Sequence, residues 1–316
     1  MTPPRRPLTA RLRTLGTIAL DKGDEQWRRV RGKAPETLAP ARPAPVPSAQ
    51  TPRRAGEFDR DAALAAYKSG VEIEDRLYNY VLYPGDSDVL CVHYSAFFGE
   101  WGERRRARAL YQGYFHRMRM FWPLTGYRFL FLCDTFGADH NGAYYKGEDG
   151  DWFVERAMDR ILDEVQEREG VAADKVVMMG SSMGATAAVR FALKRQAAGA
   201  IAVSPHFDLD LCARHQGRER HVAAIVGSQD VEDPRHFPVT REVRHLAESA
   251  PTRPLLAIQS MADDLGVHQE QVLPLVEAWS SRGGTVALDE HATGGHTSDH
   301  ATADWFEHQI RWCLGR

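Results

Sequence analysis

The sequence has little cysteine and no C-x-x-C pair. Its 316 residues include four cysteines, Cys91, Cys133, Cys212 and Cys313, so neither a disulfide framework nor a C-x-x-C redox or zinc motif is expected. Cys91 and Cys133 lie in apolar runs that indicate buried strands. We therefore expect reduced thiols in a core, which is consistent with a cytoplasmic protein.

Long apolar runs and an excess of one charge are also lacking. No stretch approaches the roughly 20 apolar residues of a membrane span, and the basic N-terminus lacks the apolar segment of a signal peptide. Lys and Arg number 40 against 43 Asp and Glu, a net charge of -3, which gives no reason to expect a nucleic-acid partner. We expect cytoplasmic residence and no membrane span; the composition leaves the oligomeric state open.

Cofactor motifs are absent as well. The sequence contains neither the glycine pattern of dinucleotide-binding turns nor that of nucleotide-phosphate loops. Its 13 histidines are scattered without the spacing of metal ligands. We expect no cofactor and no bound metal.

Residues 1–57 differ in composition from the rest. The stretch Lys33–Arg54 is rich in Pro, Ala and Arg and has no hydrophobic period. Such a segment cannot bury enough surface to offset the entropy lost on ordering. Residues 1–57 are predicted to be a flexible, basic N-terminal extension, and residues 58–316 a catalytic domain.

Strand-like and helix-like segments alternate from Phe58 onward, which predicts an α/β fold with a doubly wound, mainly parallel sheet. Tyr127–Cys133 and Val176–Met179 are almost continuously apolar, as strands buried on both faces require. Apolar residues between Val154 and Val165 recur at helical spacing. Other expected strands are Tyr78–Tyr83, Val89–Tyr94, Ile201–Val203, Leu255–Ile258 and Thr285–Leu288, and other expected helices are Ala185–Leu193, Gln271–Trp279 and Ala303–Cys313.

The pentapeptide Gly180-Ser181-Ser182-Met183-Gly184 is the strongest signal of chemistry. It is a G-x-S-x-G between a buried strand and a helix rich in small residues, the context that such a motif needs. The turn strains the serine backbone, so the residues two positions to either side must be tiny. Ser182 has a glycine two positions before it and another two positions after it, whereas Ser181 does not, so Ser182 is the candidate nucleophile.

A serine nucleophile needs a base and an acid. In a fold with this kind of serine turn, the acid follows the serine along the chain and the histidine follows the acid. The loop after the last expected strand reads Gly294-Gly295-His296, so His296 is the candidate base. His291 lies too close to the strand end, and His300 is expected at the start of the terminal helix.

The acid is expected after the preceding strand, where Asp263 and Asp264 stand side by side. Asp263 is the preferred candidate because a tight turn there would direct its carboxylate at the histidine. Asp264 stays open, as does Asp230, which ends the strand-like run Ile225–Asp230.

Backbone N–H groups would have to bind the oxyanion of the reaction. Met183 follows the nucleophile at a helix N-terminus and is one candidate donor. The second is expected in the loop after the strand that ends near Tyr94, where Ser95 and Ala96 are the candidates.

With these residues assigned, the chain from Phe58 to Arg316 resembles the α/β-hydrolase superfamily of serine esterases and acyltransferases. A narrower resemblance rests on Tyr94-Ser95-Ala96, on Asp134–Gly137 with Tyr144-Tyr145, and on Gly180–Gly184. These segments are similar to bacterial capsular-polysaccharide biosynthesis proteins and to accessory secretion proteins that O-acetylate glycans. The resemblance implies acyl transfer to a carbohydrate, or cleavage of an ester from one.

Two further residues in that resemblance are candidates for lining the substrate site. Asp134 ends an expected strand and Tyr144 follows ten residues later; the aspartate could instead hold its own loop by accepting backbone N–H bonds.

The sequence therefore predicts a serine esterase or O-acyltransferase acting through an acyl-enzyme on a small-molecule or glycan ester. The alternative is a non-catalytic α/β-hydrolase-fold scaffold that binds a partner.

Overall fold

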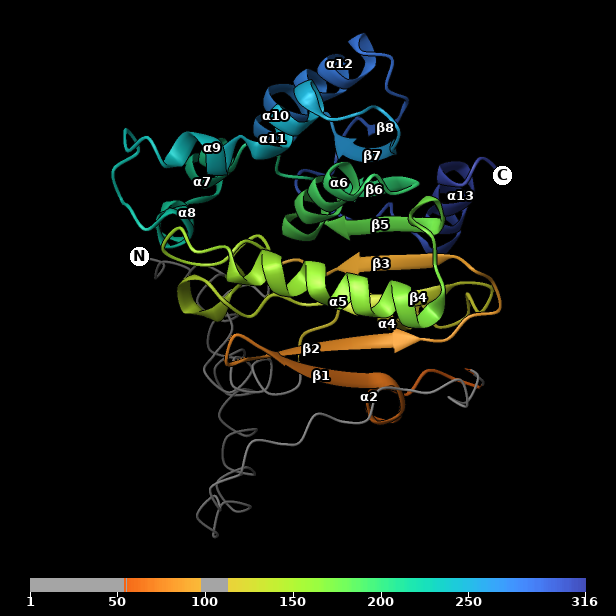
Figure 1. Ribbon diagram of the computed structural model, residues 1–316. Coiled ribbons are helices and arrows are strands. Elements are labelled where there is room, and N and C mark those ends of the chain that lie inside the picture. The colour runs from red at the N-terminus through yellow and green to blue at the C-terminus, as the bar shows by residue number, and fades with distance from the viewer. Residues whose placement is uncertain (1–53, 55, 98–112) are drawn as a thin grey trace, which may run out of the picture. The chain divides into compact units, whose positions relative to one another are not determined.

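One eight-stranded sheet organises the part of the chain that the computed structural model describes, residues 54, 56–97 and 113–316. Six strands, from β3 onward, run parallel, while β1 pairs antiparallel with β2 and β2 with β4. The predicted doubly wound, mainly parallel α/β sheet is confirmed (Figure 1). In sheet order the strands are β1 (Lys68–Ile73), β2 (Arg76–Tyr83), β4 (Arg128–Leu132), β3 (Leu90–Tyr94), β5 (Val176–Ser181), β6 (Gly199–Val203), β7 (Leu255–Met261) and β8 (Val286–His291).

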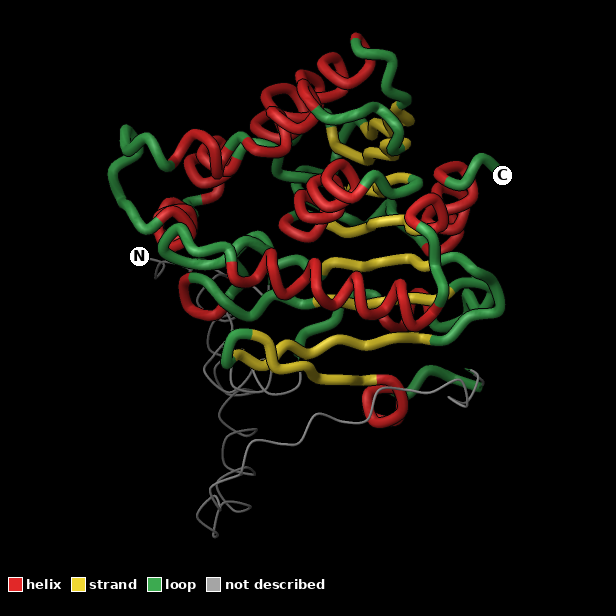
Figure 2. The backbone as a smooth tube through the Cα atoms, viewed as in Figure 1, coloured by secondary structure: helices red, strands yellow, loops and turns green. Residues whose placement is uncertain are grey.

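Two cores lie on opposite faces of this sheet, with helices on both sides of the strands (Figure 2). Alternate side chains of a strand enter different cores: Val92 and Met178 pack into one, and Cys91 and Val177 into the other. One core includes residues of α5 (Phe153–Glu169), α6 (Met183–Arg195), α10 (Glu242–Ser249) and α12 (Leu273–Ser281), and the other residues of α2 (Arg60–Tyr67), α4 (Met118–Phe121) and α13 (Ala303–Cys313). All four cysteines are free and buried.

Most of the predicted elements form where the sequence placed them. α5 buries the apolar residues between Val154 and Val165 and ends at Gly170, whose φ of 63° is the left-handed conformation of a helix C-cap. β1 is not predicted from the sequence. The strand-like interpretation of Ile225–Asp230 is wrong, because this run begins as the last turn of α8 (Glu219–Val226). The predicted extension 1–57 falls, apart from residues 54, 56 and 57, outside the described residues.

A helical insertion, residues 208–250, separates β6 from β7. It comprises α7 (Leu209–Gln216), α8, α9 (His236–Thr240) and α10. In Figure 1 the arrows of β3 and β5 point to the side where α7, α8 and α9 lie, so these helices stand beyond the carboxyl edge of the sheet. Ligands of open α/β sheets bind at that edge. Among the described helices, none combines the length and apolar character needed to cross a bilayer.

Glycine at both ends of the β5–α6 turn lets strand and helix approach closely. A Cβ at Gly184 would lie 2.1 Å from the carbonyl oxygen of Tyr94, and one at Gly180 would lie 2.3 Å from the carbonyl carbon of Gly184. Both obstacles are backbone atoms, which cannot swing away as a side chain can. These close contacts explain the predicted requirement for tiny residues two positions to either side of Ser182.

An ion-pair cluster ties α10 of the insertion to α6. Glu242 on α10 pairs with Lys146 and, at 2.5 and 3.7 Å, with Lys194 and Arg190. Burial raises the pKa of the Glu242 carboxyl, but attraction by Arg190, Lys146 and Lys194 outweighs it and brings that pKa to about 2. Glu155 on α5 completes the cluster, 2.5 Å from Lys194.

Substituting Gly184→Ala should destabilise the protein by about 3 kcal/mol, because the added methyl group meets backbone that cannot relax. Urea denaturation followed by circular dichroism measures the loss. Gly126→Ala is the matched control, since a Cβ there would have nothing within 4 Å. Equal stability of the two variants would contradict the close packing of the turn.

Substituting Glu242→Gln should lower the free energy of unfolding at pH 7 by about 3 kcal/mol. The folded pKa of Glu242 is about 2, below the ordinary value of 4.5. Its stabilisation is therefore complete above pH 4.5 and declines as the pH falls toward 2. The stability gap between native protein and variant should stay constant from pH 7 to about pH 5 and narrow as the pH falls from 4.5 to 3 in urea titrations.

Glu248→Gln is the control for that experiment. Glu248 lies on the same helix and pairs with Arg244 at 3.1 Å, with both side chains about half exposed. Exposed pairs contribute little to stability, so this variant should match the native protein throughout. A constant gap for Glu242→Gln at all pH values would show that its carboxylate charge is not what stabilises the cluster.

Candidate active site

Ser182 stands at the tip of the turn between β5 and α6 in a strained backbone conformation. Its φ and ψ are 53° and −123°, a region that residues other than glycine rarely enter. The surroundings hold it there: its N–H donates to the carbonyl of Val203 at 2.9 Å, and its carbonyl accepts from the N–H groups of Ala185 and Thr186. The half-buried side chain stands at the carboxyl edge of the sheet.

His296 reaches this serine from the loop between β8 and α13. Its Nε2 lies 3.0 Å from Ser182 Oγ. This is hydrogen-bond distance between a base and the hydroxyl oxygen whose proton it removes. Gly294 and Gly295 precede it with φ of 141° and 60°, so the chain turns in a way that side chains would oppose. The structure brings the two predicted residues together.

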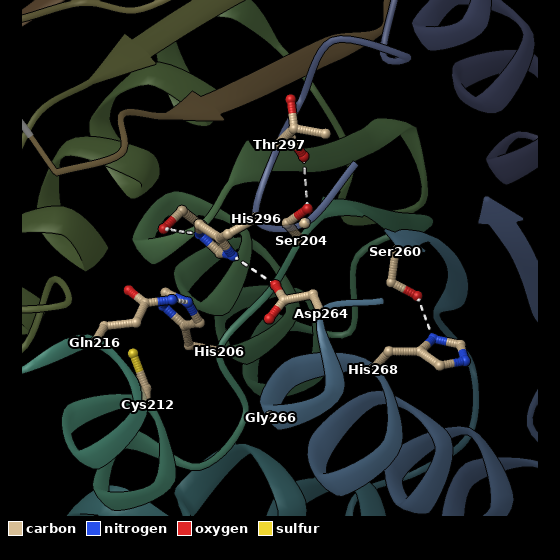
Figure 3. Close-up of polar contacts among 12 residues, drawn as sticks. Ser204, His206, Cys212, Gln216, Ser260, Asp264, Gly266, His268, His296 and Thr297 are labelled. Atoms are coloured by element: carbon tan, nitrogen blue, oxygen red, sulfur yellow. Dashed lines mark hydrogen bonds and ion pairs between the residues drawn. The ribbon is translucent and has the colours of Figure 1, made fainter. Parts of the chain in front are cut away.

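The carboxylate on His296 belongs to Asp264, not to the preferred candidate Asp263. Asp264 Oδ2 lies 3.1 Å from His296 Nδ1 (Figure 3). Asp263 instead accepts the N–H groups of Gly295 at 2.8 Å and Gly294 at 3.0 Å, and these bonds lower the pKa of its carboxyl. Asp263 therefore holds the loop that carries His296, and Asp264 contacts the His296 ring.

Asp230, the other open candidate, lies away from this group. It follows α8 in the helical insertion, and its carboxylate accepts the N–H of Glu232 at 3.0 Å. It therefore caps a turn of its own and makes no contact with His296.

The candidate oxyanion donors differ in whether their backbone N–H groups already have an acceptor. Met183 is the first residue of α6, and the first N–H groups of a helix have no partner within it. By contrast, the Ser95 N–H donates to the carbonyl of Leu132 at 3.1 Å, and the Ala96 N–H donates to His116 Nδ1 at 2.9 Å. The structure therefore differs from the expectation for Ser95 and Ala96, because both of these N–H groups are already engaged.

Asp134, expected to line the substrate site, is fully buried. Its carboxylate accepts three backbone N–H groups, from Phe136 at 3.1 Å and from Ala143 and Tyr145 at 2.7 Å each. All three donors belong to the loop that follows β4. The structural alternative is the one observed: Asp134 holds its own loop.

Tyr144 is also buried, with 2% of its surface exposed. Its hydroxyl lies 3.1 Å from His206 Nδ1 and 3.3 Å from Cys212 Sγ. The structure therefore differs from the expectation that Tyr144 lines the substrate site, because its side chain is buried and its hydroxyl bonds within the core.

Arg117 links the serine turn to the loop of His296, a role that the sequence did not reveal. Its guanidinium donates to Ser181 Oγ at 3.1 Å and to the carbonyls of Ala301 at 3.0 Å and Ser298 at 3.5 Å. Burial lowers its pKa to about 10, with Asp299 offsetting part of the effect, so the group stays charged at neutral pH. Nothing in the local sequence distinguishes this arginine from its neighbours.

A second serine–histidine–carboxylate group lies nearby and is closed to substrate. Ser260 Oγ is 2.9 Å from His268 Nδ1 (Figure 3), and His268 Nε2 is 3.1 Å from Glu290. Ser260 has no exposed surface. Because the backbone N–H of His268 also donates to the carbonyl of Asp264 at 2.7 Å, this group supports the turn that carries Asp264.

The solved structures that share this fold include three enzymes. The capsule O-acetyltransferase of Neisseria meningitidis serogroup A matches with a TM-score of 0.62 and 15% identity, over 78% of this chain and 95% of that one. The fluorophosphonate-binding serine hydrolase F of Staphylococcus aureus gives 0.55 and 16%, over 78% and 97%. An S-formylglutathione hydrolase from Agrobacterium tumefaciens gives 0.55 and 14%, over 79% and 95%.

A comparison of the sequence with curated proteins gives no match. The sequence profile of the prolyl oligopeptidase family, by contrast, matches residues 133–315. That range includes Ser182, Asp264 and His296 and exceeds half of the 316 residues. The chain therefore belongs to the prolyl oligopeptidase family and is an enzyme of the serine hydrolase type with the α/β-hydrolase fold.

Proposed function

We propose that the protein transfers an acyl group from an ester through an acyl-enzyme on Ser182, with His296 as base and Asp264 as the acid that orients it. One observation carries the proposal: His296 lies 3.0 Å from Ser182 Oγ through one ring nitrogen and 3.1 Å from Asp264 through the other. A serine hydroxyl becomes an effective nucleophile when a neighbouring base can take its proton. The half-buried serine leaves room for an acyl group to approach.

In the first step Ser182 Oγ attacks the ester carbonyl while His296 Nε2 accepts the hydroxyl proton. The carbonyl oxygen becomes an oxyanion beside the Met183 N–H, a contact that contributes roughly 3 kcal/mol in such sites. Asp264 accepts the Nδ1–H of His296, which fixes the tautomer and stabilises the imidazolium. The C–O bond of the ester then breaks, and His296 returns the proton to the departing alcohol.

In the second step an incoming hydroxyl attacks the acyl-enzyme, and His296 takes the proton from it. Water as the nucleophile releases a carboxylic acid, and an alcohol releases a new ester. His296 finally protonates Ser182 Oγ as the acyl bond breaks, so the enzyme is restored. The same three residues serve esterase and acyltransferase, which differ in what reaches the acyl group.

A carbohydrate hydroxyl is the acceptor, or the ester-bearing group, that we favour. The support is twofold: the segments Tyr94–Ala96, Asp134–Gly137 and Gly180–Gly184 resemble glycan O-acetylating proteins, and the fold matches a capsule O-acetyltransferase over 95% of that chain. Peptide hydrolysis is the second candidate, favoured by the name of the matching family.

Labelling by a fluorophosphonate tests the nucleophile. The native protein should be labelled, and Ser182→Ala and His296→Ala should lose the label while their circular dichroism is unchanged. Ser260→Ala is the control: Ser260 also bonds to a histidine, but it is fully buried, so it is not the labelled residue and the variant should retain the label. An unlabelled native protein would favour the non-catalytic scaffold.

Asp264→Asn should slow labelling by roughly 10³- to 10⁴-fold, because the uncharged amide cannot stabilise the imidazolium and its NH2 group can donate to Nδ1, which favours the wrong tautomer. Asp263→Asn should slow it far less, since the amide oxygen can still accept one of the two glycine N–H groups. Labelling rate constants of the two variants decide the assignment. A larger effect at Asp263 would reverse the two roles.

Product analysis separates hydrolase from transferase. With p-nitrophenyl acetate as donor, the protein should release nitrophenol, and a peptide p-nitroanilide should react far more slowly because the amide is the less reactive acyl group. Adding an unacetylated oligosaccharide should produce acetylated sugar, detected by mass spectrometry, if the acceptor is a carbohydrate. Acetate as the sole product at all sugar concentrations would support an esterase.

A further inference from the structure

The ring of His296 is stacked on a second histidine. The rings of His206 and His296 are nearly parallel, 11° apart, with their centroids separated by 4.6 Å (Figure 3). His206 follows β6 and has no exposed surface, whereas 27% of the His296 side chain is exposed. One face of the candidate base is thus covered by a fixed, buried ring.

His206 is anchored to the helix that carries the nucleophile. Its N–H donates to Thr186 Oγ1 at 3.1 Å, and the Thr186 hydroxyl donates to its carbonyl at 2.8 Å. Thr186 lies in the first turn of α6, four residues after Ser182. The backbone of His206 is therefore tied to the helix that follows Ser182.

Both ring nitrogens of His206 have partners that keep the ring neutral. The amide nitrogen of Gln216 donates to Nε2 at 3.0 Å, so Nε2 carries no proton. Nδ1 lies 3.1 Å from the Tyr144 hydroxyl, which in turn lies 3.3 Å from Cys212 Sγ. Burial, with smaller contributions from His296 and Arg218, lowers the pKa of His206 well below its ordinary value.

The remaining contacts to the His296 loop hold its backbone and not its ring. Asp263 accepts from Gly294 and Gly295, and Ser204 Oγ donates to the carbonyl of Thr297 at 2.6 Å. The ring itself contacts Asp264 and Ser182 at its edge, and His206 on its face. Its plane is therefore set by His206.

We propose that His206 is a positioning residue for the reaction. Its neutral ring fixes the plane of the His296 imidazole between Ser182 and Asp264, and it offers a π face to the imidazolium that forms when His296 accepts the serine proton. A charged ring in the same place would oppose that imidazolium. The inference rests on the proposed function, since His296 must act as the base.

The test compares an aromatic and an aliphatic replacement in the full chain. His206→Leu removes the stacking face, and the rate constant for labelling by a fluorophosphonate should fall on the order of tenfold. His206→Phe keeps a planar ring and should recover most of that loss. Equal slowing by Leu and Phe, or no slowing by Leu, would overturn the role of the ring.

His300→Leu is the matched control. His300 stacks on His291 with centroids 4.0 Å apart and planes 13° apart, the same kind of pair beside the same loop but with no contact to the His296 ring. Its labelling rate should equal that of the native protein. A loss as large as that of His206→Leu would mean that stacking stabilises the loop in general.

Tyr144→Phe covers the case in which His206→Leu does not fold. It removes one partner of the His206 ring with little change in core volume, and labelling should slow a few-fold. An unchanged rate in a folded Tyr144→Phe would then count against the proposal.

A second readout separates failure of this inference from failure of the proposed function. The ring ¹⁵N signals of His296 should shift in His206→Leu and stay near their native positions in His206→Phe and His300→Leu, whether or not the protein reacts. A native protein that resists the label would refute the proposed function alone. Unmoved His296 signals in His206→Leu would refute the positioning role.

Discussion

The site depends on the strained turn at Ser182. The serine can hold a φ of 53° only because β5 and α6 are packed so closely that glycine is required on both sides. This one turn directs the hydroxyl outward, begins α6 with the free N–H of Met183, and places Thr186 where it anchors His206. Packing elsewhere in the sheet has to offset the free energy that this strained conformation costs.

The parallel sheet supplies the other members of the site. β5, β7 and β8 run in the same direction, so the loops that follow them emerge at one edge and bring Ser182, Asp264 and His296 together. The loop of His296 is rich in glycine and has little rigidity of its own. Its geometry comes from partners on other elements, Arg117, Ser204 and Asp263, each of which fixes its backbone at a different point.

Features encoded within a few residues could be predicted from the sequence. The apolar run of β5, the glycines of the turn and the order serine, acid, histidine led to the fold and to the pair Ser182–His296. Features that depend on distant partners could not. Asp263 and Asp264 are chemically identical, and what separates them is a pair of N–H groups on Gly294 and Gly295, about thirty residues away in sequence.

Distant partners also explain the difference at the expected oxyanion donors, whereas the wrongly predicted strand has a local cause. Ser95 and Ala96 stand where a donor was expected, but Leu132 and His116 engage their N–H groups from other parts of the fold. Ile225 and Val226 looked like a strand because a short apolar run has no readable period; in the structure they are the buried last turn of a helix.

The adjacent carboxylates after β7 have a consequence for how this region can vary. One turn carries both the anchor of the loop, Asp263, and the partner of the ring, Asp264. Inserting or deleting a single residue there would displace both at once, and a change in the length of the Gly294–Gly295 loop would do the same from the other side. The spacing of the two segments is therefore constrained more tightly than their composition, and tolerated insertions should accumulate in the helices between β6 and β7 instead.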